Sequence, residues 1–179
     1  MKTLTFVRHA KSSWDNSNIS DHDRPLNKRG KRDAPRMGRL IHDKDILPDL
    51  IISSTAKRAT ATAKAVVAAC DYDGEIEFTR SFYHADADAF VDRISSLPNQ
   101  YEIVMVVSHN PGVEELLEDL TGQWERMPTA ALAQVDLSIS NWSELDDEAE
   151  GVLKNFWIPK SIDYWTHYIL SESAASLVS

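Results

Sequence analysis

Short apolar runs alternate along this chain with longer segments whose apolar residues recur at helical spacing. The runs at 4–7, 50–53 and 103–107 are rich in aliphatic side chains and too short for helices, which is typical of buried strands. The segments at 28–43 and 56–70 each place their apolar side chains on one face, as amphipathic helices do. Strands that alternate with helices favour a parallel arrangement, so the pattern predicts an α/β fold with a mostly parallel central sheet.

The same periodicities predict the other elements. We expect further strands at 75–79, 131–139 and 152–158, and further helices at 87–97 and from Pro111 onward. Asn27 and Asn110 are suited to cap the helices that follow them, and Gly122 is suited to end the last of these helices. The acidic segment 141–151 is expected to be a hairpin loop, with no evident role beyond solubility.

Basic side chains stand where three of the predicted strands end. Arg8 and His9 follow the first strand, and His109 follows the strand at 103–107. Arg58 lies in the first turn of the helix that follows the second strand. Because ligands of open α/β sheets bind beyond the carboxyl ends of the strands, we expect these four side chains to meet in one pocket.

This combination of side chains favours a phosphoryl group as the ligand. A phosphoryl group brings about two negative charges and three acceptor oxygens, which arginine binds bidentately. Helix N-termini add backbone N–H groups. Each residue also has a structural explanation, since an Arg–His pair at a strand end is commonly polar surface and His109 is able to cap its helix. Their occurrence together at matching strand ends is what favours a site.

Residues 11–27 form a long polar connection between the first strand and the first helix. Compact domains rarely keep structureless loops longer than about 12–15 residues unless the loop serves a site. Trp14, His22 and Arg24 are therefore candidates to face the pocket, although His22 and His42 are more typical of surface histidines.

Composition limits the partners of the chain. Its formal net charge of −9 disfavours nucleic acid as a partner. No apolar run approaches the roughly 20 residues of a membrane helix, and Arg8 interrupts the apolar N-terminal stretch, so we expect no membrane insertion and no signal peptide. Cys70 is the single cysteine and is expected in the core. We expect a cytoplasmic protein with one domain over 1–160 and a C-terminal tail over 161–179.

Four blocks of sequence carry a resemblance to a known family. They are Arg-His-Ala-Lys-Ser at 8–12, Asp-Arg-Pro-Leu with a later glycine and alanine at 23–34, Ser-Thr-Ala-Lys-Arg-Ala-Thr-Ala-Thr-Ala at 54–63, and Ser-His-Asn-Pro-Gly at 108–112. In this order they resemble the histidine phosphatase superfamily, and within it the small SixA-like branch of phosphohistidine phosphatases. The resemblance implies a phosphoglycerate-mutase-like fold, a three-layer α/β/α sandwich.

The resemblance also implies a role for each pocket residue. His9 would be the nucleophile that forms a covalent phosphohistidine, which water then hydrolyses. One ring nitrogen of His9 must then be unprotonated while an acceptor holds the other. Arg8, Arg58 and His109 would bind the phosphoryl oxygens, and a protonated His109 would stabilise charge in the transition state. The resemblance implies no metal ion and no cofactor.

Two positions depart from the family's pattern. Ala10 stands where glycine is common, which slightly narrows the backbone at the site. Mutases and many acid-phosphatase-like relatives place a carboxylic general acid after the third strand, whereas the stretch 81–85 has no carboxylate. Asp86 and Asp88 follow this stretch and are expected at the start of the next helix, but they and His84 remain candidates for the acid.

The missing acid bears on the substrate. A general acid contributes about 10²–10⁴-fold when it protonates a poor leaving group. Phosphohistidine releases an imidazole whose conjugate acid has a pKa of about 6.5, so it needs less help. We therefore expect the partner to be a phosphorylated protein that carries phosphohistidine. A small phosphorylated metabolite as substrate and a non-catalytic phospho-ligand binding module are the alternatives.

Overall fold

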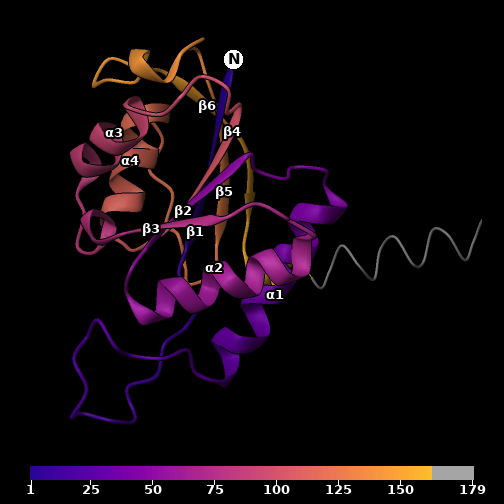
Figure 1. The fold of residues 1–179 in the computed structure, drawn as a ribbon, viewed down its shortest axis with the longest axis vertical. Coiled ribbons are helices and arrows are strands. Elements are labelled where there is room, and N and C mark those ends of the chain that lie inside the picture. The colour runs from indigo at the N-terminus through magenta and orange to yellow at the C-terminus, as the bar shows by residue number, and fades with distance from the viewer. Residues whose placement is uncertain (163–179) are drawn as a thin grey trace, which may run out of the picture.

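The computed structural model describes residues 1–162 and shows a central sheet with helices on both faces (Figure 1). The strands in this part of the chain are β1 (Lys2–Arg8), β2 (Leu50–Ser54), β3 (Ile76–Thr79), β4 (Ile103–Ser108), β5 (Leu132–Leu137) and β6 (Gly151–Trp157). The α-helices are α1 (Lys28–Asp43), α2 (Lys57–Cys70), α3 (Ala87–Ser95) and α4 (Gly112–Thr121), with short 3₁₀ turns at Arg80–Phe82 and Trp142–Glu144.

The sheet is mostly parallel, as the alternation of strands and helices predicts. Its strand order is β3-β2-β4-β1-β5-β6, and β3, β2, β4 and β1 pair in parallel. Strand β5 is antiparallel to both of its neighbours, β1 and β6. Helices α1 and α2 cover one face of the sheet, and α3 and α4 cover the other (Figure 1). The predicted three-layer α/β/α sandwich is therefore confirmed.

Each face of the sheet has its own apolar core. On one side Met37 and Ile41 of α1 pack with Val66 of α2 against the sheet, and all three are fully buried. On the other side Phe90 of α3 and Leu117 of α4 pack against their own face of the sheet and are equally buried. Burial of each such side chain contributes about 1.5–3 kcal/mol. The two cores hold the carboxyl ends of β1, β2 and β4 in fixed register.

Helix ends follow the predicted caps with one exception. The Asn27 and Asp86 side chains accept hydrogen bonds from backbone N–H groups three residues later, and Gly122 ends α4 with a left-handed φ of 66°. The predicted cap at Asn110 is wrong. Helix α4 begins at Gly112, and the Asn110 side chain instead donates to the carbonyl of Met127. A tertiary contact therefore replaces the local cap.

The acidic segment 141–151 has a structural role that its composition does not indicate. Trp142 is fully buried within it, and its indole N–H donates to the Tyr101 carbonyl at 2.8 Å. The ring lies 5.6 Å from the ammonium of Lys2, which is itself buried and pairs with Glu102. The segment therefore contributes to the core, because Trp142 closes the core at the amino end of β1.

Two further expectations concern the chain as a whole. Cys70 is buried at the end of α2, as predicted. Within residues 1–162, no helix combines the length and the apolar character that a membrane span requires. The predicted C-terminal tail over 161–179 lies outside the described residues except for its first two.

Candidate active site

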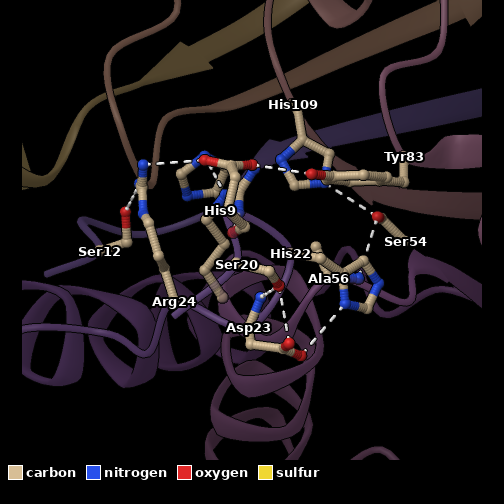
Figure 2. A network of polar contacts seen from close by, with 12 residues as sticks. His9, Ser12, Ser20, His22, Asp23, Arg24, Ser54, Ala56, Tyr83 and His109 are labelled. Atoms are coloured by element: carbon tan, nitrogen blue, oxygen red, sulfur yellow. Dashed lines mark hydrogen bonds and ion pairs between the residues drawn. The ribbon is translucent and has the colours of Figure 1, made fainter. Parts of the chain in front are cut away.

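The register of two neighbouring strands brings the two histidines together. Arg8 at the end of β1 pairs with Ser108 at the end of β4, so the residues that follow leave the sheet side by side. The backbone N–H of His9 donates to the Ser108 carbonyl at 2.9 Å. The ring centroids of His9 and His109 lie 5.0 Å apart, and both rings appear at the centre of Figure 2.

The His9 ring is held in one orientation and one tautomer. Its Nδ1 lies 2.8 Å from the carbonyl oxygen of Ala10, which can only accept a hydrogen bond. The proton of the neutral ring is therefore assigned to Nδ1, and Nε2 carries the lone pair. Arg58 donates through its Nε to this Nε2 at 3.3 Å. The side chain of His9 is thus buried, neutral and able to act as a nucleophile at Nε2.

Helix α2 fixes the backbone beside His9. The N–H of Ala10 donates to the hydroxyl of Thr62 at 2.9 Å, and this hydroxyl donates to the Arg58 carbonyl one turn earlier at 2.7 Å. Ala10 itself is fully buried. The alanine at this position is therefore accommodated, and the carbonyl that orients the His9 ring is anchored to the helix that supplies Arg58.

His109 is oriented from the neighbouring strand. Its Nε2 lies 2.9 Å from the hydroxyl of Ser54, and this hydroxyl also accepts the N–H of Ala56 at 3.3 Å (Figure 2). The Nδ1 atom of His109 is buried and has no hydrogen-bond partner among the described residues. Ser54 stands in the sequence only as the first residue of the block at 54–63, and the structure gives it a direct contact with a predicted site residue.

Arg8 makes one hydrogen bond to the loop that follows α4. Its Nη1 donates to the Met127 carbonyl at 2.6 Å, while its Nε is buried without a partner in the described part of the chain. A buried donor left unpaired costs about 1–3 kcal/mol. Arg8 and His109 therefore each present a polar atom that an anionic ligand would satisfy.

Burial keeps both histidines neutral near pH 7. It lowers the pKa of His9 to about 4, against the opposing effect of the Ala10 carbonyl and with help from nearby arginines. Burial, together with the nearby His9 and Arg58, lowers the pKa of His109 to about 2. The protonated His109 implied by the resemblance therefore requires a bound anion, whose charge raises the pKa of a neighbouring histidine.

The long loop supplies a carboxylate that sequence analysis does not identify. The Asp21 carboxylate accepts hydrogen bonds from Arg24 Nη1 at 2.9 Å, from Arg58 Nη2 at 3.0 Å and from the Tyr83 hydroxyl at 2.9 Å. The carbonyl oxygen of Asp21 also accepts from Arg58 Nη1, at 2.6 Å. The only sequence signal for this residue is the unusual length of the loop that carries it.

The candidates in the loop behave differently. Arg24 is buried and donates to Ser12 (Figure 2) as well as to Asp21. Trp14 lies over the Arg24 guanidinium, with the ring centroid 3.4 Å away, and its side chain is 71% exposed. Arg24 therefore belongs to the network that runs through Asp21 and Arg58 to His9, and Trp14 lies at the surface above it.

His22 and His42 have different environments. His22 is half-buried, because its Nε2 contacts the Thr55 hydroxyl at 3.1 Å and its ring meets Tyr83 edge-on at 4.9 Å. His22 is therefore partly exposed and also contacts residues beside the site. His42 is exposed near the end of α1, as expected.

The stretch 81–85 contains no carboxylate of its own, but the fold places the carboxylate of Asp21 beside it. Tyr83 of this stretch donates to Asp21, whereas His84 is exposed and stacks on Tyr83 with ring centroids 4.1 Å apart. Asp86 caps α3 and Asp88 lies in its first turn, as predicted. Among residues 1–162, no group of three or more histidine, cysteine or carboxylate side chains is arranged to hold a metal ion.

Comparison with known proteins places this geometry in a family. The family model of the histidine phosphatase superfamily, branch 1, matches residues 4–86. An uncharacterised protein of Arabidopsis thaliana, whose name places it in the chloroplast, is 32% identical over 152 residues, which cover 80% of this chain and 70% of that protein. An uncharacterised protein of Mycobacterium leprae is 26% identical over 86% of this chain and 100% of its own length.

Solved structures show the same fold. A structure from Agrobacterium tumefaciens, provisionally named as the phosphohistidine phosphatase SixA, has a TM-score of 0.76 and 29% identity over 88% of this chain and 98% of its own. The protein histidine phosphatase SixA in complex with tungstate has a TM-score of 0.77 over 89% of this chain and 99% of its own. At 22% identity, the second likeness concerns the fold alone.

Proposed function

The chain belongs to branch 1 of the histidine phosphatase superfamily, and on that premise we propose that it is a phosphatase that works through a covalent phosphohistidine on His9. The observation that carries the proposal is the state of the His9 ring. The ring is buried, its Nδ1 proton is held by the Ala10 carbonyl, and its unprotonated Nε2 accepts a hydrogen bond from Arg58. A nucleophile of this kind needs no prior deprotonation at neutral pH.

In the first step, His9 Nε2 attacks the phosphorus atom. The N–P bond forms while the bond from phosphorus to the leaving group breaks, and the leaving group departs with the electron pair. The positive charge that develops on the imidazole is stabilised at Nδ1 by the Ala10 carbonyl. Arg8, Arg58 and His109 bind the phosphoryl oxygens, and the unpaired Nε of Arg8 and Nδ1 of His109 support this assignment. Water then hydrolyses the phosphohistidine.

The preferred substrate is a phosphohistidine in a protein. The Asp21 carboxylate beside Tyr83 is a poor proton donor, because its hydrogen-bond partners and the nearby guanidiniums hold its pKa below the ordinary value although partial burial opposes them. A leaving group that departs as imidazole is therefore favoured over a sugar alkoxide. Trp14 and Trp124 are 71% and 61% exposed, and tryptophan is enriched at the centres of protein interfaces. Both lie on loops that contact the site residues, since Trp14 packs on Arg24 and Met127, three residues after Trp124, accepts a hydrogen bond from Arg8.

A substrate panel tests this proposal. The rate of phosphate release is measured from a phosphohistidine protein, from p-nitrophenyl phosphate and from a set of sugar phosphates. We expect the phosphohistidine protein to have the highest kcat/KM. Faster turnover of sugar phosphates would instead identify a metabolite phosphatase, and tight phosphate binding without any turnover would identify a binding module.

The nucleophile is tested separately. A His9→Asn variant should lose activity and should form no acid-labile phosphoenzyme, which mass spectrometry detects in the unmodified protein. A His42→Asn variant is the matched control, because His42 is exposed on α1 and makes no contact with the pocket residues. Full activity in the His9 variant would exclude the proposed mechanism.

A further inference from the structure

The guanidinium of Arg58 bridges the Asp21 carboxylate and the proposed nucleophile, His9. Arg58 donates through Nε to His9 Nε2 at 3.3 Å and through Nη2 to Asp21 Oδ2 at 3.0 Å. A phosphoryl group bound to His9 and held by Arg58 would therefore be a close neighbour of this carboxylate. Asp21 reaches this place from the long loop between β1 and α1, which extends beyond the end of β1 at the lower left of Figure 1.

The surroundings of Asp21 hold its carboxylate in place and in its ionised form. Three side-chain donors, from Arg24, Arg58 and Tyr83, converge on its two oxygens. Partial burial would raise the pKa of this carboxyl, but the Tyr83 hydroxyl and the guanidiniums outweigh it and keep the pKa low. An ionised carboxylate is unable to donate a proton to a leaving group, but it is able to accept one.

We propose that Asp21 is the general base of the second step, in which water hydrolyses the phosphohistidine on His9; this inference rests on the proposed function. The water oxygen forms a bond to phosphorus, the N–P bond breaks, and its electron pair returns to His9 Nε2. The water proton passes to the Asp21 carboxylate. The products are hydrogen phosphate, neutral His9 and protonated Asp21, which returns its proton to solvent through the exposed part of its side chain.

Tyr83 acts as a positioning residue for this base. Its hydroxyl donates to Asp21 Oδ2 at 2.9 Å, and it comes from the stretch where related enzymes carry a carboxylic acid. Burial raises the pKa of the Tyr83 phenol, and the neighbouring Asp21 charge raises it further, so the phenol keeps the proton that it donates. In this chain a loop carboxylate and a phenol together occupy the region of the missing acid.

Rapid-quench kinetics with p-nitrophenyl phosphate separates the two chemical steps. In D21N we expect the first turnover to release about one nitrophenol per His9, after which the steady-state rate falls by ~10²–10³ and phosphorylated His9 accumulates. Y83F should slow only the second step, by about 10-fold. D23N is the matched control on the same loop, because the Asp23 carboxylate hydrogen-bonds with Ser20 and His22 and not with Arg58 or Tyr83, and it should behave as wild type.

Formate distinguishes a lost base from a lost structural contact. In D21A, added formate should restore part of the second step, since a small carboxylate can take the place of the missing one. A structural role in holding Arg58 would lower the burst rate and the steady-state rate together, with no rescue, and would overturn the inference. Unchanged turnover in D21N would also overturn the inference. So would a D21N variant with unchanged kcat that inorganic phosphate inhibits more tightly, because Asp21 would then only compete with phosphate for the arginines. If wild type forms no phosphohistidine, the proposed function itself fails.

Discussion

Acidification should destabilise this fold through its two buried histidines. The pKa of His9 is about 4 and that of His109 about 2 in the folded protein, against about 6.5 for histidine in an unfolded chain. Between these values the unfolded state binds more protons than the folded state. Stability is therefore complete above pH 6.5 and is lost as the pH falls below it. Stability is lost because both rings bind protons in the unfolded chain but not in the folded protein.

The size of the effect follows from these pKa values. Between pH 7 and pH 5, linkage gives a loss of about 2 kcal/mol for each histidine, and about 4 kcal/mol for both. A loss of this size is large beside the roughly 5–15 kcal/mol of total stability expected for a domain. The carboxyl groups of Asp21, Asp23 and Glu144 have lowered pKa values, so their protonation weakens the fold only at lower pH. The window from pH 7 to pH 5 therefore reports the histidines.

Urea unfolding at pH 7 and pH 5 measures this difference. Wild type should lose about 4 kcal/mol of unfolding free energy between the two conditions, and His9→Asn and His109→Asn should each lose about half as much. The double variant should be nearly insensitive to pH in this window. His42→Asn is the control, because this histidine is exposed, and it should keep the pH dependence of wild type. If the double variant lost as much stability as wild type, the buried histidines would not be the cause.

Three other changes test separate parts of the structure. Trp142→Ala should lower the free energy of unfolding by about 3–5 kcal/mol in urea without changing kcat for p-nitrophenyl phosphate, because the fully buried indole lies far from the pocket. Arg58→Lys keeps the charge but loses the planar fork, so kcat/KM should fall by roughly 10–100-fold while circular dichroism stays unchanged. Trp124→Ala should raise KM for a phosphohistidine protein about 5–10-fold or more and leave p-nitrophenyl phosphate unaffected, whereas the exposed Val152→Ala on β6 should change neither.

The sheet and its two histidines follow directly from the sequence. Apolar runs too short for helices give the strands, and neighbouring parallel strands end at the same edge of a sheet. His9 and His109 stand at equivalent positions after β1 and β4, so their proximity depends only on the pairing of Arg8 with Ser108. Arg58 follows the same logic from the first turn of α2. These predictions succeed because the apolar pattern of a buried strand, and the residue at which the strand ends, can be read from the local sequence.

The missed features all depend on partners that are distant in the sequence. Asn110 is suited to cap α4, but its side chain donates to Met127 instead. Trp142 lies in an acidic segment that looks solvent-exposed, yet its indole fills a space at the amino end of β1 and donates to Tyr101. In both cases a tertiary hydrogen bond decides the position of the side chain, and for Trp142 the burial of the indole adds to it, so the preference indicated by the local sequence is overridden.

The sequence by itself determined the α/β class, the strand ends and the identity of the two histidines and two arginines, because periodicity and strand-end position are local properties of the chain. Only the tertiary structure decided what surrounds them. It fixed the tautomer of His9 through the Ala10 carbonyl and set both histidine pKa values through burial. It also brought Asp21 to Tyr83, 62 positions away, because the path of a polar loop depends on charges and donors that are distant in the sequence.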